Sequence, residues 1–253
     1  MAARRGREAA AAEPWRPETR CEPRCGAVVV RELSIVMPVL NEAGGIDAHL
    51  AALQPLRERG AALLVVDGGS TDDTVPRVRA HGVTVISAPR GRARQMNAGA
   101  QASAGACLLF LHADTRLPPQ ADQAIARALA SGADWGRFDV RIAGRHPLLP
   151  VIAALMNLRS RATGIATGDQ TIFVRRSAFD AVGGFPDQPL MEDIEISRRL
   201  RALSAPACLR QRVSTSGRRW ESRGAWRTMV LMWQLRWAYW RGESPERLAE
   251  RYR

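Results

Sequence analysis

Four short apolar runs mark the first half of the chain, and a polar or glycine-containing turn follows each of them. They occupy residues 33–40, 61–66, 83–87 and 107–111. Between the runs, apolar side chains recur at the spacing of one helix face, as in Ile46, Leu50, Leu53 and Leu56, with Asn41 as the candidate cap of that helix. Strands and helices alternate four times, which predicts a parallel, right-handed α/β sheet flanked by helices.

Two apolar helices are predicted in the second half of the chain. Residues 147–164 favour a core or flap helix, with a cleft wall or a membrane contact as alternatives. In residues 225–240, helical spacing places two apolar sets on opposite sides: Trp226, Val230, Trp233, Trp237 and Trp240, and then Leu231, Met232, Leu235 and Tyr239. Core burial, a peripheral membrane contact and a dimer interface remain open for this helix.

Charged side chains follow the predicted strands where each strand ends. They are Glu42, Asp67, the arginines of residues 90–94, and Asp114. The carboxyl ends of parallel strands share one edge of a sheet, which is where open α/β sheets bind ligands. Carboxylates for a base or a metal and arginines for phosphate predict a nucleotide site there. Considered one at a time, these residues could also have purely structural roles, in a turn, in a solvated loop or at a helix cap.

Composition narrows the chemistry and the partners. The chain has 253 residues, and all 37 of its basic residues are arginine. Without lysine, neither a P-loop lysine nor a Schiff base can take part. Residues 198–253 carry 14 arginines and four glutamates, whereas residues 26–197 are neutral. The basic end fits an anionic membrane or acceptor, nucleic acid, or a compositional bias towards arginine.

The N-terminal stretch, residues 1–30, is expected to be a flexible leader. It lacks the continuous apolar core of a signal peptide, and no apolar run in the chain reaches the roughly 20 residues that span a bilayer. The four cysteines lack metal-finger spacing, which favours a reducing compartment. We therefore expect a cytoplasmic protein, at the inner face of the membrane if the helix at 225–240 contacts lipid.

Several motifs in order resemble one enzyme family. They are IVMPVLNE, VVDGGSTDDT, RQMNAGAQASAG, LLFLHAD, TGDQTIFVRRSAFDAVGGFPD and MEDIEISRRL, which together span residues 33–203. This series resembles the inverting family 2 glycosyltransferases of GT-A fold, and in particular bacterial members with HAD and GDQ motifs. The resemblance implies a Rossmann-like mixed sheet and sugar transfer from a nucleoside diphosphate sugar to a hydroxyl acceptor, with Mg²⁺ or Mn²⁺ as cofactor.

The resemblance also implies roles for residues of the donor site. Pro38 and Glu42 match the motif that frames the nucleotide, and Asp67 matches the aspartate that contacts the base. Asp114 matches the metal-binding aspartate of the DxD motif. His112 replaces the first aspartate of that motif, so nucleotide contact, metal ligation and packing all remain open for it. Arg92, Arg94 and Asn97 are further donor-binding candidates.

The second half is expected to supply the acceptor site and the base. Asp169 and Gln170 are the acceptor-binding candidates, and the ED pair Glu192-Asp193 matches the family's catalytic pair, with Asp193 as the general base. Such a base removes the acceptor's proton during attack on the anomeric carbon. Without the resemblance, these acids would instead be taken to complement the dipole of the helix that ends near Leu203.

The predicted organisation has three parts. Residues 31–215 form the GT-A domain, with a donor half at 31–115 and an acceptor half at 116–215, and residues 216–253 form a basic, Trp-rich helical segment. Two other functions are weighed. A sugar nucleotidyltransferase would need a glycine-rich N-terminal loop with a basic residue, which PVLNEAGG does not provide. A non-catalytic membrane- or nucleic-acid-binding module would leave the strand-end carboxylates unused, so we expect no nucleic-acid partner. The oligomeric state stays open.

Overall fold

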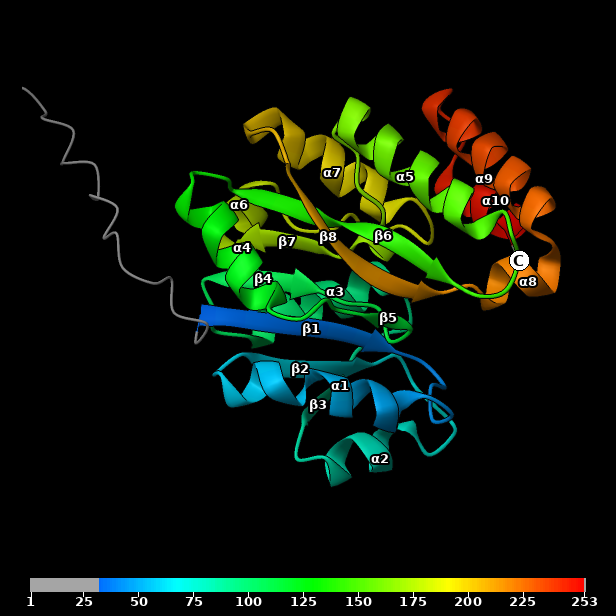
Figure 1. The fold of residues 1–253 in the computed structure, drawn as a ribbon. Coiled ribbons are helices and arrows are strands. Elements are labelled where there is room, and N and C mark those ends of the chain that lie inside the picture. The colour runs from blue at the N-terminus through cyan, green and yellow to red at the C-terminus, as the bar shows by residue number, and fades with distance from the viewer. Residues whose placement is uncertain (1–31, 253) are drawn as a thin grey trace, which may run out of the picture.

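The computed structural model describes residues 32–252, so the predicted leader at 1–30 lies outside the described residues. The described strands form one sheet in the order β3-β2-β1-β4-β7-β6-β8-β5 (Figure 1). Their bounds are β1 Leu33–Val39, β2 Ala62–Asp67, β3 Thr84–Ser87, β4 Cys107–Phe110, β5 Thr115–Arg116, β6 Trp135–Ala143, β7 Ile172–Arg175 and β8 Ala207–Ser216. The sheet is therefore the long, curved centre of the molecule.

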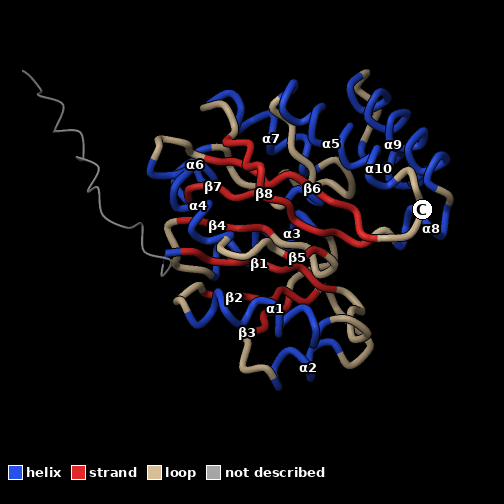
Figure 2. The backbone as a smooth tube through the Cα atoms, viewed as in Figure 1, coloured by secondary structure: helices blue, strands red, loops and turns tan. Residues whose placement is uncertain are grey.

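Helices cover both faces of this sheet (Figure 2). Their bounds are α1 Ile46–Glu58, α2 Thr74–Ala80, α3 Arg92–Ala102, α4 Ala121–Ala130, α5 Leu149–Thr163, the short 3-10 helix η2 Gly168–Gln170, α6 Arg176–Ala181, α7 Glu192–Leu203, α8 Arg218–Arg223, α9 Ala225–Trp240 and α10 Pro245–Tyr252. The helices predicted around residues 46–56, 147–164 and 225–240, and the one ending near Leu203, are all present.

The first four predicted strands pair in parallel, in the order β3-β2-β1-β4. Strand β1 is buried at every position, and β2 and β4 are almost entirely buried, which explains why these three strands are continuous apolar runs. Ile35 and Met37 pack into the core on the side of α1 and α4. Val36 packs into the core on the side of α3 and α7. The predicted parallel part is confirmed.

The second half makes the sheet mixed. Strand β7 is antiparallel to both β4 and β6, and β8 runs parallel to β6. The sequence pattern did not predict β6 or β8, because charged and polar residues interrupt their apolar positions. Arg137 of β6 is fully buried and its guanidinium pairs with Asp139 of the same strand. When buried positions of a strand carry such an ion pair, the strand cannot be recognised from its hydrophobic residues alone.

The predicted cap of the first helix is wrong. Helix α1 starts at Ile46, with Gly45 at its cap, and not after Asn41. Asn41 instead takes a left-handed backbone with φ of 56°. Its Oδ1 accepts a hydrogen bond from the Thr71 N–H at 2.8 Å, and its own N–H donates to Ser70 Oγ at 2.9 Å. Asn41 therefore joins the loop after β1 to the loop after β2.

Candidate active site

Polar contacts between the first two loops hold the predicted donor residues in place. The Glu42 N–H donates to Thr74 Oγ1 at 2.8 Å, which fixes the backbone of Glu42 beside the start of α2. Asp67 ends β2 and is buried. Its carboxylate accepts hydrogen bonds from the Gly69 and Ser70 N–H groups at 3.0 and 3.1 Å. These bonds form the tight turn for which Gly69, with φ of 92°, is suited.

A cavity of about 690 Å³ opens beyond the carboxyl ends of β1 and β4. It brings together predicted residues from five separate segments: Glu42, Arg92, His112, Asp114, Asp169, Glu192 and Asp193. Donor-half and acceptor-half groups thus share one space. Of the residues expected at the strand ends, Glu42, Arg92 and Asp114 line it, whereas Asp67 does not. The volume is in the range of small-molecule sites in proteins.

Asp193, the predicted base, is held by two backbone N–H groups. Its Oδ2 accepts from Gly168 at 2.9 Å, and its Oδ1 accepts from Ile194 at 2.8 Å. Burial raises the pKa of Asp193, whereas these two hydrogen bonds oppose that rise. For its neighbour Glu192, burial and the charge of Asp193 raise the pKa to about 7. The pair therefore contains one carboxyl group, that of Glu192, that can exchange a proton near neutral pH.

His112 and Asp169 face each other across the cavity wall. His112 Nδ1 lies 3.9 Å from Asp169 Oδ1. Burial and the nearby charge of Arg92 lower the pKa of His112 to about 4, so its imidazole is neutral at pH 7. Burial and the charge of Asp114 raise the pKa of Asp169 to about 6. A side chain at Gly168 would collide with the His112 ring, so glycine is required there.

Five predicted site residues do not line this cavity. Pro38 is buried inside β1, and Asp67 turns toward its own loop. Arg94 forms an exposed ion pair with Asp187 at 2.7 Å. The remaining two are Asn97, which exchanges hydrogen bonds with the backbone of Phe185, and Gln170.

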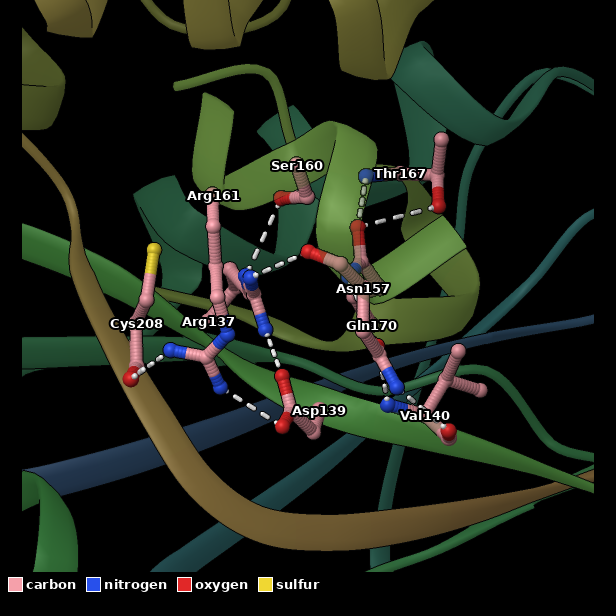
Figure 3. Close-up of polar contacts among 9 residues, drawn as sticks. All are labelled: Arg137, Asp139, Val140, Asn157, Ser160, Arg161, Thr167, Gln170 and Cys208. Atoms are coloured by element: carbon pink, nitrogen blue, oxygen red, sulfur yellow. Dashed lines mark hydrogen bonds and ion pairs between the residues drawn. The ribbon is translucent and has the colours of Figure 1, made fainter. Parts of the chain in front are cut away.

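Gln170 is fully buried and connects η2 to α5. Its Oε1 accepts from the Thr167 N–H at 3.2 Å, and its Nε2 donates to Asn157 Oδ1 at 3.3 Å (Figure 3). Asn157 in turn pairs with the backbone of Val140 in β6. In this structure Gln170 orients the loop that carries Asp169, and it makes no contact with the cavity.

Sequence reasoning missed several cavity residues from later segments. Arg159 of α5 lines the cavity, and its Nε and Nη2 are buried without a hydrogen-bond partner. Arg218 places its Nη2 4.0 Å from Glu42 Oε2, and Arg219 stacks over the Tyr252 ring at 4.6 Å. No local motif marks these arginines. The position of Arg159 depends on how α5 packs against β6, and the positions of Arg218 and Arg219 depend on how α8 packs against α9.

The helix at 225–240 presents its two sides to different surroundings. Leu235 is fully buried, whereas Trp226, Trp233, Trp237 and Trp240 are between 59% and 82% exposed. The interpretation in which the core buries both sides is therefore wrong for the single chain, since only one side packs against α7 and α10. Within residues 32–252, no helix is long and apolar enough to cross a bilayer.

Comparison with known proteins gives both sequence and structural matches. An uncharacterized glycosyltransferase of Mycobacterium bovis is 33% identical over 103 residues, which is 40% of this chain and 45% of that protein. Glucosyl-3-phosphoglycerate synthase of Mycobacterium tuberculosis is 41% identical over 58 residues, 22% of this chain and 18% of that protein. The aligned segments thus span less than half the length of these curated relatives.

Two solved structures share the fold. The Pyrobaculum calidifontis mannosyltransferase PcManGT, in complex with GDP-Man and Mn²⁺, superposes with a TM-score of 0.60 at 20% identity, over 87% of this chain and 68% of that one. The M. tuberculosis glucosyl-3-phosphoglycerate synthase, in complex with Mn²⁺, UDP and glucosyl-3-phosphoglycerate, gives a TM-score of 0.53 at 22% identity, over 72% and 70%.

The predicted GT-A type of mixed sheet is therefore confirmed by the described fold and its structural neighbours. The sequence model of the family described as Glycosyl transferase family 2 matches residues 34–183. This match covers more than half of the chain and includes β1 to β4 and the GDQ segment. The chain belongs to glycosyltransferase family 2.

Proposed function

We propose that this protein is an inverting glycosyltransferase that moves a sugar from a nucleoside diphosphate sugar to a hydroxyl acceptor, with the help of a divalent cation. The observation that carries the proposal is the single cavity in which Asp114, at the donor strand ends, and Asp193, at the start of α7, both lie. Family membership argues against a nucleotidyltransferase and against a module without catalysis.

Asp114 is the residue that fits a divalent cation. It is exposed at the end of β4, and Glu42 and Asp169 contribute further negative charge to the same cavity. Among the described residues, no three His, Cys, Asp or Glu side chains are grouped to hold an ion by themselves. One carboxylate with substrate phosphates and water satisfies Mg²⁺ or Mn²⁺. Bound there, the cation would neutralise charge that develops on the leaving diphosphate.

Asp193 is suited to take the proton of the acceptor. As the acceptor oxygen attacks the anomeric carbon, the bond from that carbon to the diphosphate breaks and the hydroxyl proton passes to the Asp193 carboxylate. The N–H groups of Gly168 and Ile194 hold the carboxylate in one orientation during this step. Attack opposite the leaving group inverts the anomeric configuration.

The structural neighbours support the donor class without identifying the sugar. PcManGT is described with GDP-Man and Mn²⁺, and the mycobacterial synthase with UDP and either Mn²⁺ or Mg²⁺. We therefore propose UDP-linked and GDP-linked sugars as the first donors to test. Pro38, Asp67, Arg94 and Asn97 would then support the donor site from behind the cavity wall, and Arg92 and His112 would face the donor.

A thermal-shift panel tests this proposal. UDP, GDP, dTDP and their sugars are added with and without Mn²⁺ to the wild type, to Asp114→Ala, and to the control Asp134→Ala, whose side chain is 41% exposed beside Arg175. At a ligand concentration about 100 times its Kd, one nucleotide should raise the Tm by roughly 5–10 °C. The rise should need metal and persist in Asp134→Ala. A rise that persists in Asp114→Ala, or no rise with any nucleotide, contradicts the proposal.

A further inference from the structure

The cavity extends past the catalytic carboxylates into an apolar groove between α5 and α9. Leu155, Met156 and Leu158 of α5 and Met229, Met232 and Trp233 of α9 line this groove. Figure 1 shows the two helices beside each other at the same end of the sheet. A sugar acceptor that is polar throughout gains nothing from such walls, because apolar surface binds apolar groups.

The mouth of the groove is apolar as well. Leu155, Leu158 and Trp233 line the groove and are also 45%, 65% and 60% exposed. The exposed apolar residues continue with Val151 of α5 and with Leu148, just before that helix, and along α9 with Trp226, Trp237 and Trp240. These two stripes are called here the apolar rim. Contiguous exposed apolar surface of this kind usually marks a site of interaction with another molecule or with a membrane.

The apolar rim does not result from a loosely packed helix. Helix α5 is fixed to β6 by a buried network in which Arg137 Nε donates to Ser160 Oγ at 3.0 Å, and Arg161 donates to Asp139 at 2.6 Å (Figure 3). Arg137 and Asp139 also pair with each other. The outward direction of Leu155 and Leu158 is therefore built into the fold.

Arg159 adds an anion site between the groove and the catalytic base. It lines the cavity, and its Nε and Nη2 are buried without a hydrogen-bond partner. A buried guanidinium with free N–H groups is unfavourable until an anion accepts from them. Asp193, whose charge acts on Arg159, is itself held by backbone N–H groups. A phosphate on the acceptor would satisfy Arg159 and bring its hydroxyl to Asp193.

The two helices that carry the apolar rim have charges of one sign. Helices α5 and α9 contain arginines at 159, 161, 227 and 236 and no acidic residue. Arg236 lines the groove, and Arg241 stacks over the Trp237 ring at 4.6 Å. Tryptophan with arginine on a two-sided helix is the pattern of a helix that lies in the interface of an anionic membrane.

We propose that the acceptor is a membrane lipid with an anionic, hydroxyl-bearing headgroup. Arg159 binds the headgroup phosphate, the lipid chain occupies the groove between α5 and α9, and the apolar rim lies on the bilayer. This inference rests on the proposed sugar transfer at Asp193. The headgroup hydroxyl forms the bond to the anomeric carbon, the nucleoside diphosphate leaves, and the proton passes to Asp193, so no further reactant is needed.

Sedimentation with vesicles tests the membrane contact. The full chain is mixed with vesicles of phosphatidylcholine alone or with phosphatidylglycerol, whose headgroup carries both a phosphate and hydroxyls. The wild type should sediment with the anionic vesicles, and less so as salt rises. Trp237→Ala/Trp240→Ala should lower the partition coefficient by about tenfold or more. The control Leu203→Ala, 52% exposed at the end of α7 and away from the groove, should leave it unchanged.

Transfer to lipid tests the acceptor. With the donor selected by the thermal-shift panel, release of nucleoside diphosphate and labelling of phosphatidylglycerol should both require the anionic vesicles. Arg159→Met should retain vesicle binding and the metal-dependent Tm rise but lose labelling by at least tenfold. Arg127→Met, which exchanges the same residue type at an exposed position of α4 that does not line the cavity, should retain labelling.

Three results would overturn the lipid acceptor while leaving the proposed sugar transfer intact. The first is a normal metal-dependent Tm rise with no binding to anionic vesicles. The second is efficient transfer to soluble 3-phosphoglycerate without vesicles, which would assign Arg159 to a free phosphate. The third is a dimer in sedimentation equilibrium that Trp237→Ala/Trp240→Ala converts to monomer. Loss of the Tm rise itself would instead overturn the proposed function.

Discussion

Buried polar groups find hydrogen-bond partners more completely in the donor half, residues 32–115, than in the rest of the described chain, residues 116–252. In the donor half, loops and helices satisfy one another: Gln95 Nε2 donates to the carbonyls of Val39 and Val66 at 2.9 and 2.8 Å, which joins α3 to the ends of β1 and β2. Of the described residues before 116, His49 alone has a buried side-chain polar atom without a partner. In this half, the buried polar groups are thus almost all paired within the protein.

The second half leaves more groups unsatisfied around the same cavity. Arg159 and Thr228 line the cavity with buried polar atoms that lack hydrogen-bond partners, and Trp233 and Leu158 expose apolar surface at its mouth. Buried polar groups in folded proteins are normally paired, so these groups are free to pair with a bound molecule. The difference is what we expect if, as proposed above, the donor site is preformed and the acceptor completes its own site.

The largest predicted effect is on catalysis, at the boundary of the two halves. Asp193→Asn keeps the shape of the side chain and one acceptor oxygen but removes the base. We expect transfer to fall by about 10³-fold, because a positioned general base contributes about 10²–10⁴-fold. Single-turnover kinetics measure the loss, and calorimetry with the nucleotide and Mn²⁺ should give an unchanged Kd.

Glu195→Gln is the matched control for this variant. Glu195 lies in the same first turn of α7, but its carboxylate pairs with Arg198 and Arg199 on the outer side at 2.8 and 2.9 Å. We expect its turnover to stay within a factor of two or three of wild type. Equal turnover in Asp193→Asn and wild type would remove Asp193 from the mechanism.

The next prediction concerns His49, the exception in the donor half. Burial lowers the pKa of His49 from 6.5 to about 4. The unfolded chain therefore binds this proton at a higher pH than the folded chain does. Above pH 6.5 His49 has no effect, and between pH 6.5 and 4 it should reduce the free energy of unfolding by about 1.4 kcal/mol per pH unit, of the order of 3 kcal/mol in total.

Urea unfolding of His49→Leu between pH 4 and 7 measures this contribution. The variant should match or exceed the wild type at pH 7, because leucine leaves no unpaired nitrogen, and should exceed it by the largest margin near pH 4. His81→Leu, at the exposed end of α2, should retain the acid-side loss of the wild type. Parallel curves for His49→Leu and wild type would contradict the lowered pKa.

The same contrast explains what the sequence could predict. Strands β1, β2 and β4 were predictable because burial makes them apolar runs. Glu42 and Asp114 were predictable because strand order sets their edge. Arg159 was not, since only the packing of α5 against β6 brings it to Asp193. Gln170 was predicted as an acceptor contact because it follows Asp169 in the GDQ motif. In the structure Asp169 lines the cavity. Gln170, the next residue, does not, and its Nε2 instead donates a hydrogen bond to Asn157 Oδ1.

The smallest predicted effect concerns the exposed side of α9, where we expect side chains to serve binding and not to stabilise the fold. Trp240 is 82% exposed, whereas Leu235 on the opposite side of α9 is fully buried. We expect Trp240→Ala to change the free energy of unfolding by less than about 0.5 kcal/mol, as at other exposed sites. Leu235→Ala should cost about 2–5 kcal/mol, because it leaves a cavity in the core. Urea unfolding without lipid measures both. A loss at Trp240 as large as that at Leu235 would mean that the tryptophan side of α9 is already covered in solution, and the chain after the donor half would then be as self-contained as the donor half.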